Sequence, residues 1–247
     1  FPECVLFRPQ SDHDVQSFSL EDTIITWFQD LAKNNQKWIL VGSFFYNNPD
    51  MNGTTNTSVL IDPTGHIQQH YDKMHLFDVT IDNLSFVESQ RFIAGTSPKT
   101  AMINDFLCGF SICFDLRFPE LYRSYASQQA HLCFVPSSFT TSTGTHHWHT
   151  LCRARAIENQ IYVATAGTIG NIPSVENMDI NYAQSGIYTP SDFAFPPEAV
   201  AGECSPNLET VVIADLDLAT LERTRKSGTV TNWRDRRDDM YKVIEVE

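Results

Sequence analysis

The chain has 247 residues, of which 42% are hydrophobic and 19% charged, and its formal net charge is −13 at pH 7. This balance is typical of a globular protein with a sizeable core and excludes a largely disordered chain. The negative charge argues against nucleic acid or an anionic membrane surface as a partner, and no apolar stretch is long enough to span a bilayer.

The chain opens on Phe1-Pro2-Glu3, which is typical of the end of a strand rather than of a natural start. We therefore expect a strand and a helix to be missing upstream, and the absence of a signal peptide says little. The six cysteines form no C-x-x-C pair and lie mostly in apolar segments, which indicates free thiols in a reducing, cytoplasmic compartment. Asn56-Thr57-Ser58 fits the glycosylation triplet, but in a cytoplasmic chain such a match is accidental.

The first half of the chain predicts one helix, then an apolar strand and a hairpin. Ser19 and Asp22 are typical of a helix N-terminus, and apolar residues with helical spacing follow them. The turn sequence Asp62-Pro63-Thr64-Gly65 indicates the hairpin. The expected elements are a helix that follows Asp22 and ends at Asn34-Asn35, and strands at Trp38 to Phe45, Thr57 to Ile61 and His66 to Tyr71.

The second half alternates apolar runs with helical patterns, as β-α-β units do. Asn171 to Ala183 is predicted to be a surface loop, and the proline-rich stretch Phe193 to Pro206 has no clear pattern. With no interdomain linker visible, we expect a single α/β domain over residues 1–247. The expected elements are a strand ending at Cys113, a helix from Pro119 to Ala130, a strand from His131 to Val135, a helix from Trp148 to Ile157, strands at Ile161 to Ala166 and Thr210 to Leu216, and a helix from Ala219 to Lys226.

Cys113 lies where the apolar run that begins at Phe106 stops and polar residues with a proline follow. Such a run suits a strand buried on both faces, and Pro119 suits the first turn of a helix. Cys113 would then lie at the carboxyl end of a strand, where open α/β sheets bind ligands, beside a helix N-terminus that favours a thiolate. A buried cysteine is more often a small core residue, so these features alone leave both interpretations open.

Five segments resemble the signature segments of the nitrilase, or carbon-nitrogen hydrolase, superfamily. Each segment alone is weakly specific, but five in the same order over nearly the whole chain are highly specific. The stretch after Cys113 is similar to that of the small Nit-type amidases, including ω-amidases, rather than to that of true nitrilases. The segments are Phe1-Pro2-Glu3, Tyr71 to Phe77, Ile112 to Glu120, Arg153 to Asn159 and Arg236 to Tyr241.

The resemblance implies a four-layer α-β-β-α sandwich, commonly a homodimer or higher homo-oligomer, with no metal or organic cofactor. It also implies a triad in which Glu3 is the general base, Lys73 the cation at the oxyanion and Cys113 the nucleophile. Glu88 matches a second glutamate that braces the lysine and positions substrate. Amide hydrolysis needs a nucleophile, a proton carrier and oxyanion donors, and we expect the backbone N–H of Phe114 to be one such donor. Taken singly, the glutamate and the lysine would be read as solvated surface charges.

The substrate pocket is expected near the histidines that precede the Arg153 segment. His146, His147 and His149 lack the i, i+4 spacing of a zinc helix, and we expect no metal there. Where the family usually has Gly-Pro-x-His-Trp-Glu, His149 replaces the acidic residue. Phe139, His147 and His149 are therefore the candidate pocket residues.

Two further expectations concern the turn at Cys113 and the hairpin turn near Asp192. Asp115, Arg117 and Glu120 are expected to form structural ion pairs that hold the cysteine turn, since arginine pairs bidentately with carboxylates. Asp192 stands where the family has a glycine, so the hairpin turn there should be altered or lengthened.

The resemblance predicts hydrolysis of a small linear amide to a carboxylate and ammonia through a thioester, and an ω-amide of a dicarboxylic acid is one such substrate. This substrate needs a cation for its distal carboxylate, which we expect in the segment from Thr140 to His149. The alternatives are hydrolysis of a carbamoyl group or a nitrile by the same triad, or a catalytically silent binding or assembly subunit.

Overall fold

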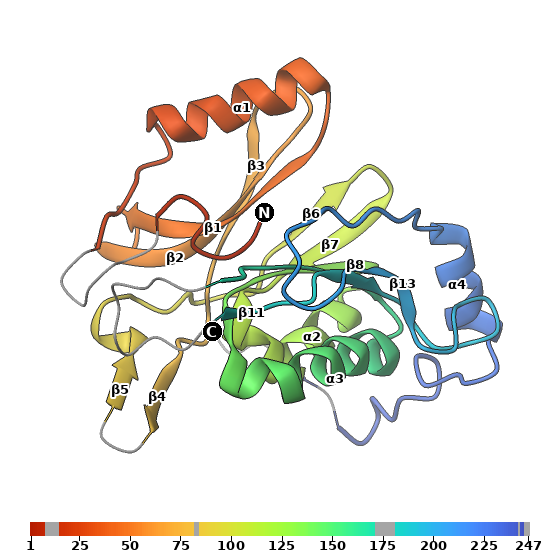
Figure 1. Cartoon of the computed structure of the whole chain (residues 1–247). Helices are drawn as coiled ribbons and strands as arrows, with labels where there is room; N and C mark the ends of the chain where they lie inside the picture. Colours follow the sequence, from red (N-terminus) through yellow and green to blue (C-terminus); the bar gives the residue numbers. More distant parts are fainter. Residues whose placement is uncertain (8–14, 82–83, 171–180, 242, 245–247) are drawn as a thin grey trace.

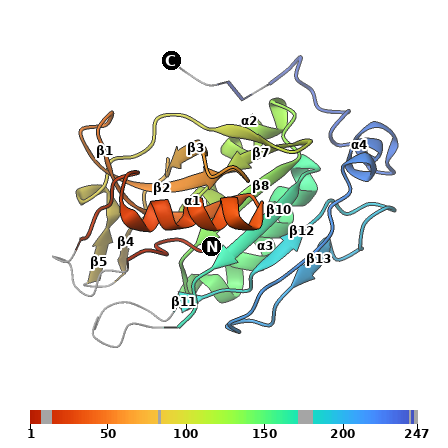
Figure 2. The same cartoon turned by 90° about the horizontal axis from the view of Figure 1, so that it is seen from above.

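The computed structural model describes residues 1–7, 15–81, 84–170, 181–241 and 243–244. Within them, two β-sheets lie face to face, with helices on the outer side of each (Figure 1). Seen from above, α1 (Thr23–Asn35) crosses the first sheet, and the second sheet and α3 (Thr141–Asn159) lie beneath it (Figure 2). The layers therefore follow one another as helix, sheet, sheet and helix, and the predicted sandwich is confirmed.

The first sheet carries the antiparallel hairpin that the turn sequence predicted. Asp62 accepts hydrogen bonds from the backbone N–H groups of Thr64 and His66, which closes the turn. The apolar face of α1, formed by Ile25, Phe28 and Ala32, packs against this sheet. In spatial order the strands are β1 (Ile39–Asn48), β2 (Gly53–Ile61) and β3 (Ile67–Asp72).

The second sheet contains the predicted β-α-β units, because its neighbouring strands β7, β8 and β10 are parallel. The helices α2 (Pro119–Ser127) and α3 connect them, and Pro119 begins α2 as predicted. In spatial order the strands are β13 (Val200–Glu203), β12 (Gly186–Tyr188), β10 (Tyr162–Gly167), β8 (Leu132–Ser137), β7 (Phe106–Phe110) and β6 (Thr100–Ile103).

Several short elements complete the described chain. A hairpin and a 3-10 helix follow the first sheet, a second 3-10 helix begins at Cys113, and a short two-stranded ladder lies beside α3. The helix predicted near the end of the chain is also present. These elements are β4 (Asp78–Ile81), β5 (Leu84–Val87), η1 (Glu88–Gln90), η2 (Cys113–Arg117), β9 (Phe139–Thr140), β11 (Asn181–Tyr182) and α4 (Leu218–Ser227).

The strand predicted from Thr210 to Leu216 is wrong. This segment runs past Gly202 of β13, and its exposure alternates as expected, with Val211 and Ile213 facing outward. The structure assigns no strand to it, because a strand needs paired backbone groups as well as an alternating pattern.

The structure describes part of the predicted surface loop and the turn at Asp192. Residues 171–180 of the predicted surface loop lie outside the described residues, and Asn181–Tyr182 forms β11 instead of loop. Asp192, which replaces the family's glycine, accepts hydrogen bonds from the backbone N–H groups of Phe193 and Thr229. The aspartate therefore ties its turn to the segment that follows α4.

The core that joins the sheets contains residues from both of them. Leu60 and Tyr71 of the first sheet belong to the same buried cluster as Phe110 and Val135 of the second. This contact positions the ends of β3 and β7 next to each other, and the candidate site lies at those ends.

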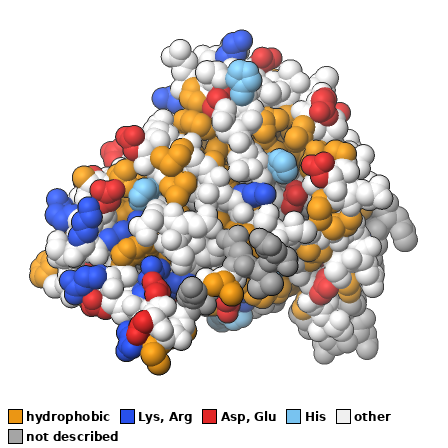
Figure 3. All heavy atoms as spheres, turned by 180° about the vertical axis from the view of Figure 1, so that it is seen from behind, with side chains coloured by type: hydrophobic (Ala, Val, Ile, Leu, Met, Phe, Trp, Pro, Cys, Tyr) orange, Lys and Arg blue, Asp and Glu red, His pale blue; other side chains and the backbone are white. Residues whose placement is uncertain are grey.

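The surface seen from behind carries acidic and basic side chains next to one another rather than in one large patch of a single sign (Figure 3). Ion pairs between residues close in the sequence, such as Arg234 with Asp235 and Arg237 with Asp239, occur near the end of the chain. Among the described residues, no helix combines the length and the apolar character needed to cross a bilayer. All six cysteines are free thiols.

Candidate active site

Glu3, Lys73 and Cys113 come together at one buried site, although they lie far apart along the chain. Lys73 Nζ is 2.9 Å from Glu3 Oε1, and the Glu3 carboxylate is hydrogen-bonded to the Cys113 thiol. The exposed fractions are 5% for Glu3, 2% for Lys73 and 8% for Cys113. A carboxylate, an ammonium and a thiol therefore share a place from which water is largely excluded.

Glu3 is positioned by contacts to both sheets. The Pro2 carbonyl accepts a hydrogen bond of 3.1 Å from Ser43 N–H on β1. Gly42 permits this close approach, because a Cβ atom there would lie 1.8 Å from the Pro2 carbonyl oxygen. The Glu3 carbonyl accepts a hydrogen bond from Thr168 Oγ1, just after β10. The glutamate therefore lies where the two halves of the sandwich meet.

Lys73 directly follows β3, and its backbone N–H donates to the Asn56 carbonyl at 2.8 Å. Its ammonium lies between two carboxylates, since Nζ is also 3.1 Å from Glu88 Oε1 and 2.9 Å from Glu88 Oε2. Glu88 Oε2 accepts a further hydrogen bond from Phe77 N–H at 2.6 Å. Glu88 therefore braces Lys73, in the position that the family resemblance gave it.

Cys113 begins η2 with a φ of 48°, in the left-handed region that non-glycine residues rarely adopt. The buried Asp115 carboxylate holds this turn by accepting from Ile112 N–H at 2.9 Å. The same carboxylate accepts from the Tyr71 hydroxyl at 2.7 Å and from His75 N–H at 2.9 Å. Asp115 thus fastens the cysteine turn to the chain on either side of Lys73.

The charges of the site determine where its protons lie. Burial opposes ionisation of Glu3, but the charge and hydrogen bond of Lys73 outweigh it, and the pKa of Glu3 is lowered. Burial would also lower the pKa of Lys73, yet the charges of Glu3 and Glu88 raise it well above its usual range. The resting site therefore contains a carboxylate at Glu3 and an ammonium at Lys73.

The helix N-terminus beside Cys113 favoured a thiolate, but the folded surroundings of the sulfur favour the thiol. Burial and the negative charge of Glu3 raise the pKa of Cys113 well above its usual range. Lys73 and the backbone N–H of Ser138, which donates to the sulfur, act in the opposite direction without reversing the shift. Because the sulfur holds its proton at rest, a neighbouring base must remove that proton during any attack.

Asn56 belongs to the site and was missed in the sequence. Its Nδ2 donates to Glu3 Oε1 at 2.9 Å and to Glu88 Oε1 at 3.3 Å, and it is 1% exposed. In the sequence, Asn56 attracts attention only as part of a glycosylation triplet. The structure buries this side chain, so it is inaccessible. Its position on β2, opposite the strand that leads to Lys73, was the available signal.

Comparison with known proteins identifies the family. The model of the carbon-nitrogen hydrolase family matches residues 1–226. The chain belongs to this family. In this carbon-nitrogen hydrolase, Lys73 directly follows β3 and Cys113 begins η2, whereas Glu3 precedes α1.

The named relatives are similar over most of this carbon-nitrogen hydrolase. The deaminated glutathione amidase of Dictyostelium discoideum is 35% identical over 94% of the chain and 80% of that protein. The omega-amidase NIT3 of Saccharomyces cerevisiae is 34% identical over 90% of the chain and 72% of that protein. The crystal structure of the NitFhit protein of Caenorhabditis elegans matches with a TM-score of 0.75 and 30% identity, over 91% of the chain and 52% of that chain. The chain spans between 41% and 80% of the first relatives that it matches.

The residues predicted for the pocket lie in different places. His147 Nδ1 is 3.0 Å from Arg117 Nη1, and the Arg117 guanidinium lies 5.2 Å from the ring centre of Phe139 and 5.9 Å from that of Phe114. His149 instead contacts Glu203 of β13, at 3.1 Å. Phe139, His147 and Phe114 therefore surround one arginine, whereas His149 ties α3 to a sheet edge.

Arg117 does not form the structural ion pair that was expected of it. Asp115 is occupied by backbone, tyrosine and histidine donors, and the described contacts of Arg117 are to aromatic rings and to His147. Its charge acts on Cys113, so the guanidinium lies near the sulfur. In the part of the chain that the structure describes, no group of three His, Cys, Asp or Glu side chains is gathered around a possible metal position.

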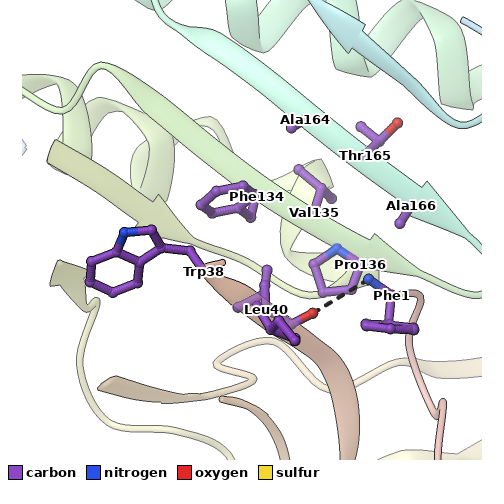
Figure 4. Close-up of a pocket in the computed structure, with 10 residues that line it drawn as sticks. Phe1, Trp38, Leu40, Phe134, Val135, Pro136, Ala164, Thr165 and Ala166 are labelled. Carbon is purple, nitrogen blue, oxygen red and sulfur yellow. Dashed lines mark hydrogen bonds between the residues drawn. The ribbon is translucent and has the colours of Figure 1, made fainter. Parts of the chain in front are cut away.

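A surface groove lies elsewhere, between β1 and the strands β8 and β10. It has a volume of about 300 Å³, and Figure 4 shows the apolar side chains of Trp38, Leu40, Phe134 and Val135 around it. The Phe1 amino group, which donates to the Leu40 carbonyl, is its one titratable group. This groove offers no pair of groups for nucleophilic or acid–base chemistry, so the candidate active site is the buried cluster at Cys113.

Proposed function

We propose that this carbon-nitrogen hydrolase cleaves the carboxamide of a small linear molecule, with Cys113 as nucleophile and Glu3 as general base. The observation that carries the proposal is the contact of the Glu3 carboxylate with both the Lys73 ammonium and the Cys113 thiol. The names of the relatives, a deaminated glutathione amidase and an omega-amidase, support an amide as the substrate.

In the first half of the reaction, Glu3 takes the thiol proton while the sulfur attacks the amide carbon. The carbonyl oxygen becomes an oxyanion, which Lys73 and the backbone N–H of Phe114 stabilise by about 3–4 kcal/mol for each well-placed donor. Glu3 then gives its proton to the nitrogen, the C–N bond breaks and ammonia leaves. The acyl group remains on Cys113 as a thioester.

In the second half, Glu3 removes a proton from a water molecule whose oxygen attacks the thioester carbon. The same donors hold the second oxyanion. When this intermediate collapses, the C–S bond breaks, and the proton on Glu3 returns to the sulfur of Cys113. The products are a carboxylic acid, which ionises, and the free thiol, so protons and electrons balance over the cycle.

The substrate is proposed to be an ω-amide that carries a carboxylate at its other end. Arg117 supports this choice because its charge lies near the sulfur and its guanidinium lies against two aromatic rings. Burial lowers the pKa of Arg117 from its usual value, but arginine stays charged near neutral pH. A half-buried guanidinium beside rings is suited to hold the flat, charged end of such a molecule.

The test is ammonia release from a panel of short ω-amides, neutral amides, carbamoyl compounds and nitriles. We expect turnover of the ω-amides by the wild type, none by Cys113→Ala, and an acyl adduct on Cys113 in quenched samples by mass spectrometry. Cys152→Ala is the matched control, since Cys152 is also a buried thiol, and it should retain activity. Equal turnover by Cys113→Ala would refute the nucleophile, and carbon dioxide release from carbamoyl compounds alone would refute the amide substrate.

A further inference from the structure

Asn56 contacts all three charged residues of the buried cluster, Glu3, Lys73 and Glu88. Its Nδ2 reaches the Oε1 atoms of both Glu3 and Glu88, and its backbone carbonyl accepts from Lys73 N–H. Lys73 Nζ donates to the same two Oε1 atoms, at 2.9 and 3.1 Å. The two carboxylates are therefore cross-linked twice, once by an ammonium and once by a neutral amide.

The Oδ1 atom of Asn56 is buried and has no hydrogen-bond partner. An unpartnered buried acceptor is costly, so a side chain chosen only to fill space here would be apolar. The presence of an amide rather than an apolar group is explained by its N–H groups, which donate to the carboxylates of Glu3 and Glu88.

The charges around these two carboxylates explain why a neutral amide donor is favoured at this position. The cluster contains Glu3, Glu88 and Lys73, with the Cys113 thiol and the Arg117 guanidinium nearby. One ammonium faces two carboxylates, and two negative groups so close disfavour each other's ionisation. A neutral donor shared between them relieves this repulsion without adding a charge that would compete with Lys73.

We propose that Asn56 is a positioning residue that fixes the orientation of the Glu3 carboxylate by anchoring its Oε1 atom, so that the other oxygen, Oε2, serves the Cys113 thiol. This proposal rests on the proposed function, because it explains how the Glu3 carboxylate, the general base, is oriented toward the Cys113 thiol. Asn56 contacts neither the sulfur nor the reacting atoms in this arrangement, and acts through Glu3 and Glu88.

The experiment uses the full chain and compares Asn56→Leu, Asn56→Asp and Asn159→Leu with the wild type. Asn159 is the matched control, since it is also 1% exposed, donates twice through Nδ2 and has an unpartnered Oδ1. Two readouts are measured against pH: kcat and KM for the best amide, and the rate at which iodoacetamide alkylates Cys113, followed by mass spectrometry. Alkylation needs no substrate, so it tests Asn56 even if the proposed substrate class fails.

For Asn56→Leu we expect kcat to fall about 10- to 100-fold with KM changed less than about 2-fold, as for loss of a hydrogen bond to a charged group. The acidic limb of the alkylation profile should move to higher pH, because Glu3 loses a donor that stabilises its carboxylate. Asn56→Asp keeps the shape but supplies a third carboxylate, so the limb should move further in the same direction. It also serves as the second variant if the leucine protein does not fold.

The proposal is overturned if either Asn56 variant keeps the wild-type alkylation profile, or if Asn159→Leu shifts that profile equally. A rise in KM with unchanged kcat would also overturn it, since that result would place Asn56 against the substrate. If Cys113→Ala keeps full turnover while alkylation still responds to Asn56, the proposed function fails and the positioning role stands.

Discussion

Arg117 is the side chain whose surroundings contribute most to the argument for the proposed substrate class. It is held against the rings of Phe114 and Phe139 and lies beside His147. An arginine placed only for stability would be expected to pair with a carboxylate, as Arg155 does with Glu158. The described contacts of Arg117 are instead to aromatic rings and to His147, and its charge interacts with Cys113.

We predict that Arg117→Met discriminates against charged substrates. Methionine keeps an unbranched apolar stem but removes the charge, so KM for an ω-amide with a distal carboxylate should rise about 10- to 100-fold. KM for a neutral amide of the same length should change less than about 2-fold, since it lacks the group that the guanidinium holds. Steady-state ammonia assays on the two substrates measure this difference. An equal loss on both would show that Arg117 supports the fold rather than the specificity.

Among the individual residues, the sequence alone located only part of the site. The family resemblance drew attention to Glu3, Lys73 and Cys113, which lie in signature segments, and to Glu88, which matches a second family glutamate. The structure brings all four together. Asn56 is part of no such segment and depends on the β2–β3 register, which a hairpin signal does not fix. The raised pKa of Cys113 could not be predicted from the sequence, because burial and the charge of Glu3 depend on the folded surroundings.

The element that joins the two halves of the site is η2, and Asp115 is its anchor. The Asp115 carboxylate is fully buried and accepts from Tyr71, His75 and Ile112. Through these donors the 3-10 helix is attached to the chain around Lys73. The His75 ring, which stacks on Phe118 at 3.7 Å, adds a second contact between the same segments.

Asp115→Ala should destabilise the protein by about 3–5 kcal/mol, because it leaves several buried donors without an acceptor. Urea denaturation followed by fluorescence measures the loss as a lower midpoint. The exposed Asp235, whose pair with Arg234 lies in solvent, is the control, and Asp235→Ala should leave the midpoint unchanged. A normal midpoint for Asp115→Ala would mean that the turn is held by packing alone.

Elements with a strong local signal were predicted well, and those that depend on partners were not. The helix at α1, the turn at Asp62 and the start of α2 at Pro119 follow from short-range patterns. The segment from Thr210 to Leu216 has the alternation of a strand but lacks the pairing, and no local pattern contains that information. Asp192 likewise accepts a hydrogen bond from a donor 37 residues away, the backbone N–H of Thr229.

The whole molecule buries several groups that ionise at alkaline pH. Burial raises the pKa of Tyr71, Tyr122 and Tyr125 well above the usual range, and the carboxylates raise that of Lys73 despite its burial. In the unfolded chain these groups lose their protons near pH 10, whereas the folded chain keeps them. The stability they contribute is therefore fully present below about pH 10 and is lost as the pH rises from there toward the raised pKa values of the folded state.

We therefore predict that the midpoint of thermal unfolding falls steeply above about pH 10. In the folded protein, the tyrosinate absorbance should report only the exposed phenols until the unfolding transition, when the buried ones ionise together. Melting curves at a series of pH values, followed by tyrosinate absorbance, measure both effects. Gradual ionisation of all phenols before unfolding would show that the buried ones are accessible in the folded state.

The contact of Glu3 with both sheets has a consequence for how this protein can fail. Each sheet keeps its own ladder of hydrogen bonds, so a slip of one half over the other would leave secondary structure and most of the spectroscopic signature intact. The same slip would draw the base away from the sulfur, and a displacement of about 1 Å is enough to cost roughly 100-fold in rate. Some variants in the intersheet core should therefore be well folded but catalytically inactive. A folding assay alone would not distinguish them from the wild type.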